Sequence, residues 1–224
     1  MIIKRLFNSS IGNKFLVAIS GLAMIGFLIA HLIGNLQIFI GAHAINQYAW
    51  FLKQIPEITW TMRLGLIAMI IIHIFFTIKL TLANKKARPQ AYAVKKAMKA
   101  TLSSRTMAVS GLIVLSFIIY HLIHFTFLLT HPEISHYVDE NGWHDVYKMV
   151  VLSFQQPHLV FFYVLALTLL FSHLHHGIQS LFHTLGLTNK NWSPIIDKGG
   201  KAFALILYLG YISIPLSILV GLVK

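Results

Sequence analysis

Five long hydrophobic stretches divide the chain, at residues 14–40, 58–83, 105–130, 157–183 and 202–223. A helix of about 20 mostly apolar residues crosses a bilayer, so each stretch predicts one transmembrane helix. The first stretch is too long for the apolar region of a signal peptide and is interpreted as a retained helix. The polar segments between the stretches are too short to form a second domain. We therefore expect an all-α integral membrane protein in which residues 1–224 form a single domain. The first four helices are expected to form a bundle, with the fifth as a peripheral helix packed beside it.

Local signals predict where some of these helices begin and end. Residues 8–10, Asn-Ser-Ser, can cap the first helix. Pro89 prevents the second helix from continuing. The segment 131–156 is the most polar part of the chain, and a short amphipathic piece is expected near residues 143–154. Pro215 is expected to kink the fifth helix.

The composition excludes several classes of protein. Hydrophobic residues make up 57% of the chain and charged residues 11%, whereas soluble domains are about 25% charged. The chain contains no cysteine, which excludes iron–sulfur clusters held by thiolates and any disulfide framework.

The net charge of +12 is unevenly distributed. Basic residues lie near the start of the first stretch, between the second and third stretches, and between the fourth and fifth stretches. They are Lys4, Arg5, Lys14, Lys85, Lys86, Arg88, Lys95, Lys96, Lys99, Arg105, Lys190, Lys198 and Lys201. The alternate intervals hold Glu57, Glu133, Asp139, Glu140 and Asp145, with Lys53 and Lys148 as their basic residues. Lysine and arginine accumulate on the cytoplasmic side. The pattern therefore predicts a multi-pass protein of the cytoplasmic (inner) membrane, with the N-terminus inside and Lys224 outside.

The basic face could meet anionic lipid headgroups or a docked soluble subunit. It could equally do no more than set the topology. Nucleic-acid binding is a poor fit, because the basic residues flank membrane helices and form no separate module.

Each of the first four stretches carries a histidine deep in its apolar run: His31, His73, His121 and His173. Ionisable residues inside a membrane are costly and usually functional, although one such histidine could simply hydrogen-bond a neighbouring helix. His31 lies 17 residues after Lys14, and His121 lies 16 residues after Arg105. His73 and His173 each lie 11 residues before a polar residue at the end of the helix, Asn84 and Thr184 respectively. The four side chains therefore match in depth as two pairs, with levels roughly 8 Å apart.

Two imidazoles at one level favour haem over other metals. Zinc prefers four tetrahedral ligands, and neither level offers a carboxylate or a thiolate. Two axial histidines with a macrocycle in the equatorial plane are typical of electron-transfer cytochromes. Gly21, Gly26 and Gly111 could let a macrocycle approach the helices, although small residues also serve ordinary helix packing.

The fourth helix offers a choice of ligand, because residues 172–177 read Ser-His-Leu-His-His-Gly. Depth favours His173, and His176 is the fallback. The remaining histidines are interpreted as structural or as loop residues: His43, His124, His131, His136, His144, His158, His175 and His183. A weak internal repeat is also visible: a Ser-Gly pair occurs in the first and the third helix, and the glycine lies ten residues before the histidine in each case, Gly21 before His31 and Gly111 before His121.

Several motifs together resemble one family, the five-helix, dihaem cytochrome b membrane anchor of succinate dehydrogenase and fumarate reductase. They are Ser9-Ser-Ile-Gly-Asn-Lys14, Ser20-Gly21 to Ala30-His31-Leu-Ile-Gly-Asn35, Asn46-Gln-Tyr48, His73 followed by Asn84 and Ala87-Arg-Pro89, Ser104-Arg-Thr-Met107, Gly111 to His121, and His173-Leu-His-His-Gly177 leading to Leu185-Gly186. They span almost the whole chain in order.

The resemblance implies two haems b, the outer between His31 and His121 and the inner between His73 and His173. The family has its ligand four residues before the glycine of the fourth helix, which selects His173. Flavoprotein and iron–sulfur subunits would dock on the cytoplasmic face, and electrons would pass between them and a quinone, with menaquinone expected. Such a complex II belongs to the tricarboxylic acid cycle. Its succinate chemistry needs a flavin subunit, since this chain has no phosphate-cradling glycine loop.

Two family features are less firmly placed. Glu57 resembles a glutamate near the outer haem of some relatives and is a candidate quinone residue, although a solvated carboxylate at a helix end is the slightly favoured explanation. Some relatives carry a glutamate for proton return two residues before the fourth ligand, where this chain has Phe171. The propionates of the inner haem could contact Ser9, Ser10, Arg88, Arg105 and Lys190. The accumulation of lysine and arginine on the cytoplasmic side explains the basic residues equally well.

Two alternatives compete with this interpretation. One is the dihaem anchor of a formate dehydrogenase, a hydrogenase or a quinol:cytochrome c reductase; the last normally places two ligands on each of two helices. The other is a haem-free, histidine-lined transporter of metal ions or protons. Transporters often carry acidic residues in the membrane, and the five predicted spans contain none.

Overall fold

The computed structural model describes residues 7–87 and 106–224, and within these it is almost entirely helical. Five helices are long and apolar enough to cross a membrane, which confirms the predicted all-α membrane fold. They are α2 (Ser10–Leu36), α4 (Pro56–Lys86), α6 (Met107–His121), α8 (Pro157–Thr184) and α9 (Ser193–Leu219). The first continues as a 3-10 turn, Gln37–Phe39, and the third as a π-helical turn, Leu122–Thr126.

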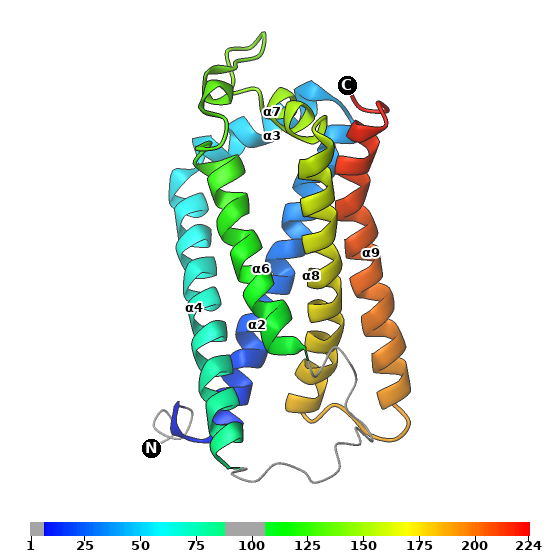
Figure 1. The fold of residues 1–224 in the computed structure, drawn as a ribbon. Helices are drawn as coiled ribbons and strands as arrows, with labels where there is room; N and C mark the ends of the chain where they lie inside the picture. The colour runs from blue at the N-terminus through cyan, green and yellow to red at the C-terminus, as the bar shows by residue number, and fades with distance from the viewer. Residues whose placement is uncertain (1–6, 88–105) are drawn as a thin grey trace.

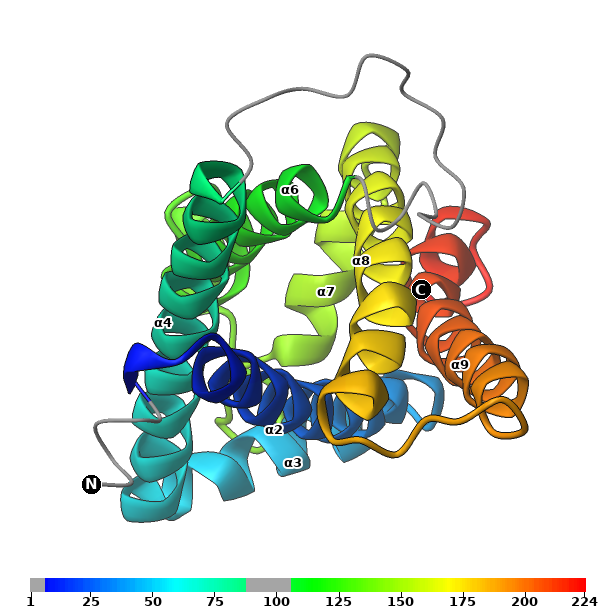
Figure 2. The same cartoon turned by 90° about the horizontal axis from the view of Figure 1, so that it is seen from below.

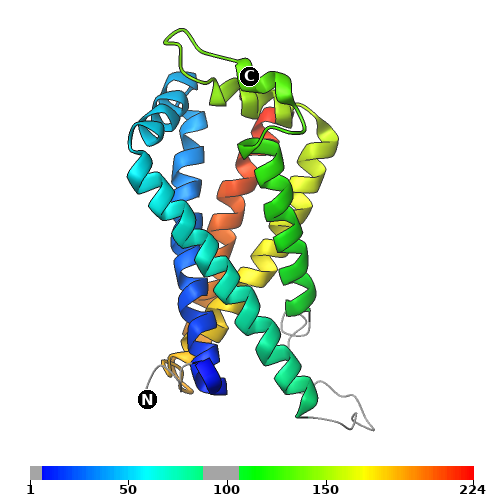
Figure 3. The ribbon, with the colours of Figure 1, turned by 90° about the vertical axis from the view of Figure 1, so that its left-hand side faces the viewer.

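The four histidine-bearing helices form a bundle with α9 alongside it (Figure 1). Seen along the bundle, α2 lies opposite α6 and α4 lies opposite α8, while α9 packs on the outside of α8 and also contacts α2 (Figure 2). Helix α4 runs obliquely to the other long helices (Figure 3). The start of α2 and the C-terminus lie at opposite ends of the bundle, as an odd number of spans requires (Figure 1).

Two short helices, α3 (Ala42–Gln54) and α7 (Val146–Phe154), cover the end of the bundle nearest the C-terminus. The second confirms the amphipathic piece expected near residues 143–154. The first lies in the interval between the first two apolar stretches, where hydropathy predicted no helix. Asn46 of α3 joins the two short helices: its amide donates to carboxylates of Asp139 and Asp145, and its oxygen accepts from the backbone N–H of Tyr147.

Helix ends follow local chemistry. The Ser9 hydroxyl caps α2 by accepting from the backbone N–H of Gly12 at 3.0 Å. Prolines in the first turn begin α4, α8 and α9. The fifth helix begins at Ser193 rather than at residue 202, so Asp197, Lys198 and Lys201 lie in its first turns and not in a loop. Hydropathy alone placed the start too late, because these polar residues interrupt the apolar run.

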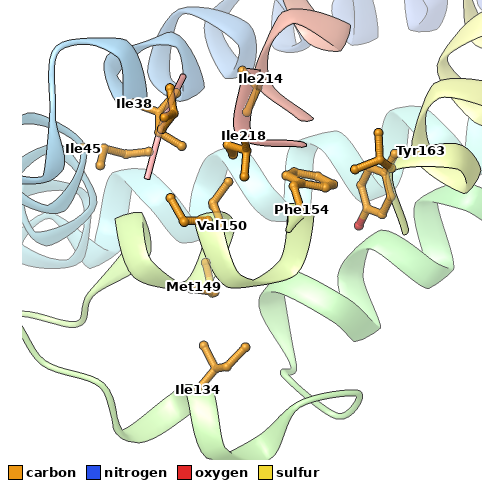
Figure 4. Close-up of a cluster of buried hydrophobic side chains, with 12 residues drawn as sticks. Ile38, Ile45, Ile134, Met149, Val150, Phe154, Tyr163, Ile214 and Ile218 are labelled. Atoms are coloured by element: carbon orange, nitrogen blue, oxygen red, sulfur yellow. The ribbon is translucent and has the colours of Figure 1, made fainter. Parts of the chain in front are cut away.

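Tight packing is concentrated at the end of the bundle that carries α3 and α7. There, residues of α3, α7, α8 and α9 form the larger buried cluster, which includes Ile45, Val150, Phe154 and Ile218 (Figure 4). A smaller cluster joins α2, α8 and α9. By contrast, α4 has one buried residue, Phe76. The only buried residue of α6 is Ser110.

Large apolar side chains on α4 and α6 are exposed in the single chain, among them Leu64, Ile71 and Leu112. Helices α4 and α6 therefore present faces that the protein itself does not cover, and lipid or a prosthetic group would have to cover them.

Candidate functional site

The outer pair, His31 of α2 and His121 of α6, meets across one diagonal of the bundle. The two ring centres lie 5.8 Å apart with the ring planes at 90°. The inner pair, His73 of α4 and His173 of α8, meets across the other diagonal. Its ring centres lie 6.5 Å apart with the planes at 60°. The structure thus brings together the same two pairs that matched in depth.

The two levels are further apart than counting along the sequence suggested. Ser20 contacts the inner pair and His31 belongs to the outer pair, and they are 11 residues apart on the same helix (31 − 20). At about 1.5 Å per residue this is roughly 16 Å rather than 8 Å. The count was short in part because it took Lys14 as the base of the first helix, whereas α2 already begins at Ser10.

The ring separations suit a pair of imidazoles on opposite sides of one metal ion. A metal–imidazole bond is about 2 Å long, so two opposed ligands place their ring centres roughly 6 Å apart. Among the residues that the structure describes, no group of three or more His, Asp or Glu side chains could hold an ion. Two protein ligands at each level therefore fit haem, whose macrocycle supplies the other four nitrogens, better than they fit zinc.

The orientation of the His73 ring can be deduced from its partners. Its Nδ1 lies 3.1 Å from the backbone oxygen of Val17 and 3.2 Å from the Ser20 hydroxyl. A carbonyl oxygen can only accept a hydrogen bond, so Nδ1 carries the hydrogen. The lone pair is then on Nε2, where an axial ligand needs it.

The His173 ring has the equivalent partner on α6. Its Nδ1 lies 3.2 Å from the Ser110 hydroxyl. Gly21 and Gly111 face the two inner rings. A methyl group on Gly21 would lie 3.4 Å from Cε1 of His73, and one on Gly111 would lie 3.3 Å from Cε1 of His173. Gly26, by contrast, has nothing within 4 Å of such a methyl group.

The outer pair lies in aromatic surroundings. Phe27 stacks on His31 at 5.2 Å, and Phe117 and Phe125 flank His121. Polar support is weaker here. The Asn35 amide lies 3.4 Å from both ring nitrogens of His31. Nδ1 of His121 is buried without a hydrogen-bond partner among the described residues.

The fifth helix contributes to the outer level, although it was expected to be peripheral. The Tyr211 ring lies 6.3 Å from that of His31. Its hydroxyl donates to the backbone oxygen of Leu28 at 2.7 Å. The sequence offered one signal for this contact, a tyrosine within an apolar stretch, but nothing in it indicated which helix the tyrosine would face.

His124, which the sequence placed among the structural histidines, is only 2% exposed. It lies in the π-helical turn, and its Nδ1 is 2.9 Å from the Tyr163 hydroxyl. The Tyr163 ring in turn lies 6.2 Å from His121. This pair therefore packs behind an outer ligand, a relation that sequence spacing did not reveal.

The other histidines of α8 have different surroundings from His173. His175 Nε2 lies 3.2 Å from a carboxylate oxygen of Asp197 on α9. His183 Nδ1 lies 2.9 Å from the Thr188 hydroxyl. Nδ1 of His176, the fallback ligand, is buried without a hydrogen-bond partner in the described part of the chain. No ring contact joins His176 to His73 among the described residues, whereas one joins His173 to His73.

The remaining candidate residues have simpler local explanations. Glu57 is exposed in the first turn of α4, where a carboxylate stabilises the helix dipole. Ser9 caps α2, and Ser10 and Lys190 are exposed at the same end of the bundle. The following predicted residues lie outside the described residues: Lys4, Arg5, Arg88, Pro89, Lys95, Lys96, Lys99, Ser104 and Arg105.

Comparison with known proteins adds no relative: no family profile, curated protein or solved structure matches the chain.

Proposed function

We propose that this chain is a dihaem cytochrome b that anchors a succinate:quinone oxidoreductase (complex II) in the membrane. The observation that carries the proposal is the arrangement of two histidine pairs across the two diagonals of one bundle, with ring centres 5.8 Å and 6.5 Å apart. His31 and His121 would hold the outer haem b, and His73 and His173 the inner haem b. When bound, the haems would supply one-electron carriers at two depths of the membrane.

The chain's own residues prepare these sites. The Val17 carbonyl and the Ser20 hydroxyl hold the His73 ring with Nε2 available. Phe27, Phe117 and Phe125 keep the outer pair in apolar surroundings. The few buried side chains on α4 and α6 suit helices that pack against a group other than protein.

The family resemblance extends this proposal to partners. Flavoprotein and iron–sulfur subunits would dock on the basic end of the bundle, which would be cytoplasmic, and Lys224 would lie outside. A membrane quinone, proposed to be menaquinone, would exchange electrons with the haems, with Glu57 as the candidate quinone residue. Phe171 packs against Tyr208 with ring centres 5.6 Å apart. It carries no exchangeable proton, so we propose no proton path through that position.

The first experiment is a reduced-minus-oxidised optical spectrum of the purified chain with a pyridine haemochrome count. The expected result is a b-type spectrum with about two haems per chain. Folded protein without haem, after expression with adequate haem supply, would overturn the proposal and favour the transporter interpretation.

A second experiment tests the physiological partner. Coexpression with candidate flavoprotein and iron–sulfur subunits should allow succinate to reduce the haems, and a quinol should reduce them as well. Haem that responds to the quinol but never to succinate, in a chain that does not copurify with those subunits, would indicate the anchor of a different quinone-linked dehydrogenase.

A further inference from the structure

We propose that Ser20 and Ser110 are positioning residues that set the orientation and the electron-donor strength of the inner ligands His73 and His173. This inference rests on the proposed haem function. It starts from a repeat in the structure: helices α2 and α6 each present a Ser-Gly pair to the inner histidine of a neighbouring helix.

The two contacts are nearly identical. The hydroxyl oxygen of Ser20 lies 3.2 Å from Nδ1 of His73, and that of Ser110 lies 3.2 Å from Nδ1 of His173. Both serines are almost fully buried, with exposed fractions of 1% and 5%. In both helices the same Ser-Gly pair lies ten residues, counted from the glycine, before that helix's own outer ligand. The two helix pairs, α2 with α4 and α6 with α8, are therefore equivalent at the inner level.

The direction of each hydrogen bond follows from the other bonds of the serine. The Ser20 hydroxyl donates its hydrogen to backbone oxygens of its own helix, Leu16 at 2.7 Å and Val17 at 3.1 Å. The Ser110 hydroxyl donates to the backbone oxygen of Met107 at 3.0 Å. A hydroxyl has one hydrogen, so a serine that donates to its own helix accepts from the imidazole. For His73 the Val17 carbonyl at 3.1 Å independently requires a hydrogen on Nδ1, and we infer the same tautomer for His173.

The neighbouring glycines limit how far each ring can move. A methyl group at Gly21 or Gly111 would already be in tight contact with Cε1 of the ring. A larger residue at either glycine would therefore press on the ring, while a serine hydroxyl contacts the ring at Nδ1. An acceptor on the distal N–H makes an imidazole a stronger electron donor to a metal and fixes its orientation.

The outer ligands lack this arrangement. The residue four positions beyond His31 is Asn35, and the equivalent residue beyond His121 is Phe125. The two helices therefore match in their contacts to the inner histidines but not in the residues beside the outer histidines. A substitution of either serine should act on the inner site alone.

Redox titration of the haem-loaded chain, carrying Ser20→Ala or Ser110→Ala, tests this inference. Loss of the acceptor weakens electron donation to oxidised iron, so each variant should raise the midpoint potential of the inner haem and leave the outer potential unchanged. The shift should be larger for Ser110→Ala, because in Ser20→Ala the Val17 carbonyl remains 3.1 Å from Nδ1 of His73. The affected haem should also dissociate roughly 10–100-fold more readily. Ser116→Ala is the matched control, because that hydroxyl, also on α6, bonds to its own helix at the Leu112 oxygen.

A second variant protects the test against misfolding. Ser110→Cys keeps the side-chain size with a weaker acceptor, so it should shift the same potential in the same direction by less. Potentials of the folded variants that match the Ser116→Ala control, or that fall, would overturn the positioning role while two haems remain bound. A wild-type chain without haem would instead overturn the proposed function itself, and this inference with it.

Discussion

The inner and outer pairs present the same two imidazoles in different surroundings. At the inner level, Nδ1 of both rings has a hydroxyl partner from a neighbouring helix. At the outer level, phenylalanine and tyrosine rings surround the pair, and Nδ1 of His121 has no partner among the described residues. The inner histidines are thus held by hydrogen bonds and the outer histidines mainly by packing. The comparison teaches that two histidine pairs in a single bundle can be oriented by different kinds of force.

The packing around each level differs in the same sense. The larger buried cluster, made by α3, α7, α8 and α9, lies on the outer side of the bundle. Near the inner pair, α4 and α6 bury one residue each. We therefore expect changes in packing to affect the outer site, and changes in polar partners to affect the inner site.

Removing a ligand should have the largest effect. His73→Ala and His31→Ala should each lose about half of the bound haem, because each site has only two protein ligands. The remaining spectrum should be the outer component in the first variant and the inner component in the second. The pyridine haemochrome count and the optical spectrum measure both effects.

His176→Ala serves as the control for these variants, because His173 and not His176 contacts His73. It should retain both haems. Loss of a haem in His176→Ala with retention in His173→Ala would reassign the fourth ligand.

Tyr163→Phe should lower the stability of the outer side. The change leaves the buried His124 without its hydroxyl partner at Nδ1, and its Nε2 already lacks one among the described residues. An unsatisfied buried polar atom costs about 1–3 kcal/mol, so the free energy of unfolding should fall by that amount in a denaturant titration in detergent. Tyr208→Phe, whose hydroxyl bonds exposed Thr168, should change stability little. Equal effects of the two variants would contradict a special role for His124.

Gly210→Ala should disturb the contact of α9 with α2. A methyl group there would lie 2.7 Å from Cδ2 of Leu32, one residue beyond His31. Since the end of the leucine side chain can move, the cost should be about 1 kcal/mol, at the low end for overpacking. Thermal unfolding and the outer haem spectrum should both report it. Gly65→Ala, where a methyl group meets nothing within 4 Å, should instead stabilise α4 by roughly 0.5–1 kcal/mol.

The smallest effect should be a pH dependence at the end that carries α3 and α7. Desolvation raises the pKa of the Asp139 carboxyl, but hydrogen bonds from the backbone N–H groups of Trp143 and Asn141 and from the Asn46 amide outweigh it and hold the pKa below the usual 3.8. A lowered pKa in the folded state stabilises the fold above the unfolded pKa. That contribution is lost as the pH falls below about 3.8 and through the lowered value.

Hydrogen exchange of α3 and α7 between pH 5 and pH 3 measures this loss. Asp139→Asn should remove the dependence, and Glu140→Gln, at an exposed neighbour, should preserve it. Retention of the full pH dependence in Asp139→Asn would show that another group is responsible.

The fold was largely predictable, because the length and apolar content of each span decide whether a helix crosses a membrane. The prediction failed where a helix does not follow hydropathy. Helix α3 is only partly apolar, and its polar residues include Asn46, which is buried against Asp139 and Asp145 from about a hundred residues away. The start of α9 was missed for a similar reason, because its first turns carry Asp197 and Lys198.

The histidine pairs were predictable because depth in a helix follows from counting residues. Their surroundings were not. Tyr211, Tyr163 and Ser110 reach the pairs from other helices, and contacts between helices depend on rotation and tilt, which local spacing does not encode.

The sequence by itself determined five apolar spans, the charge asymmetry and which of the four histidines share a level, since each of these follows from the order and spacing of residues along the chain. Only the tertiary structure decided which diagonal each pair occupies, that the levels are roughly 16 Å apart, and that serines orient the inner rings while aromatic residues enclose the outer rings. These features arise where residues distant in the chain meet, and helix packing alone sets which side chains face one another.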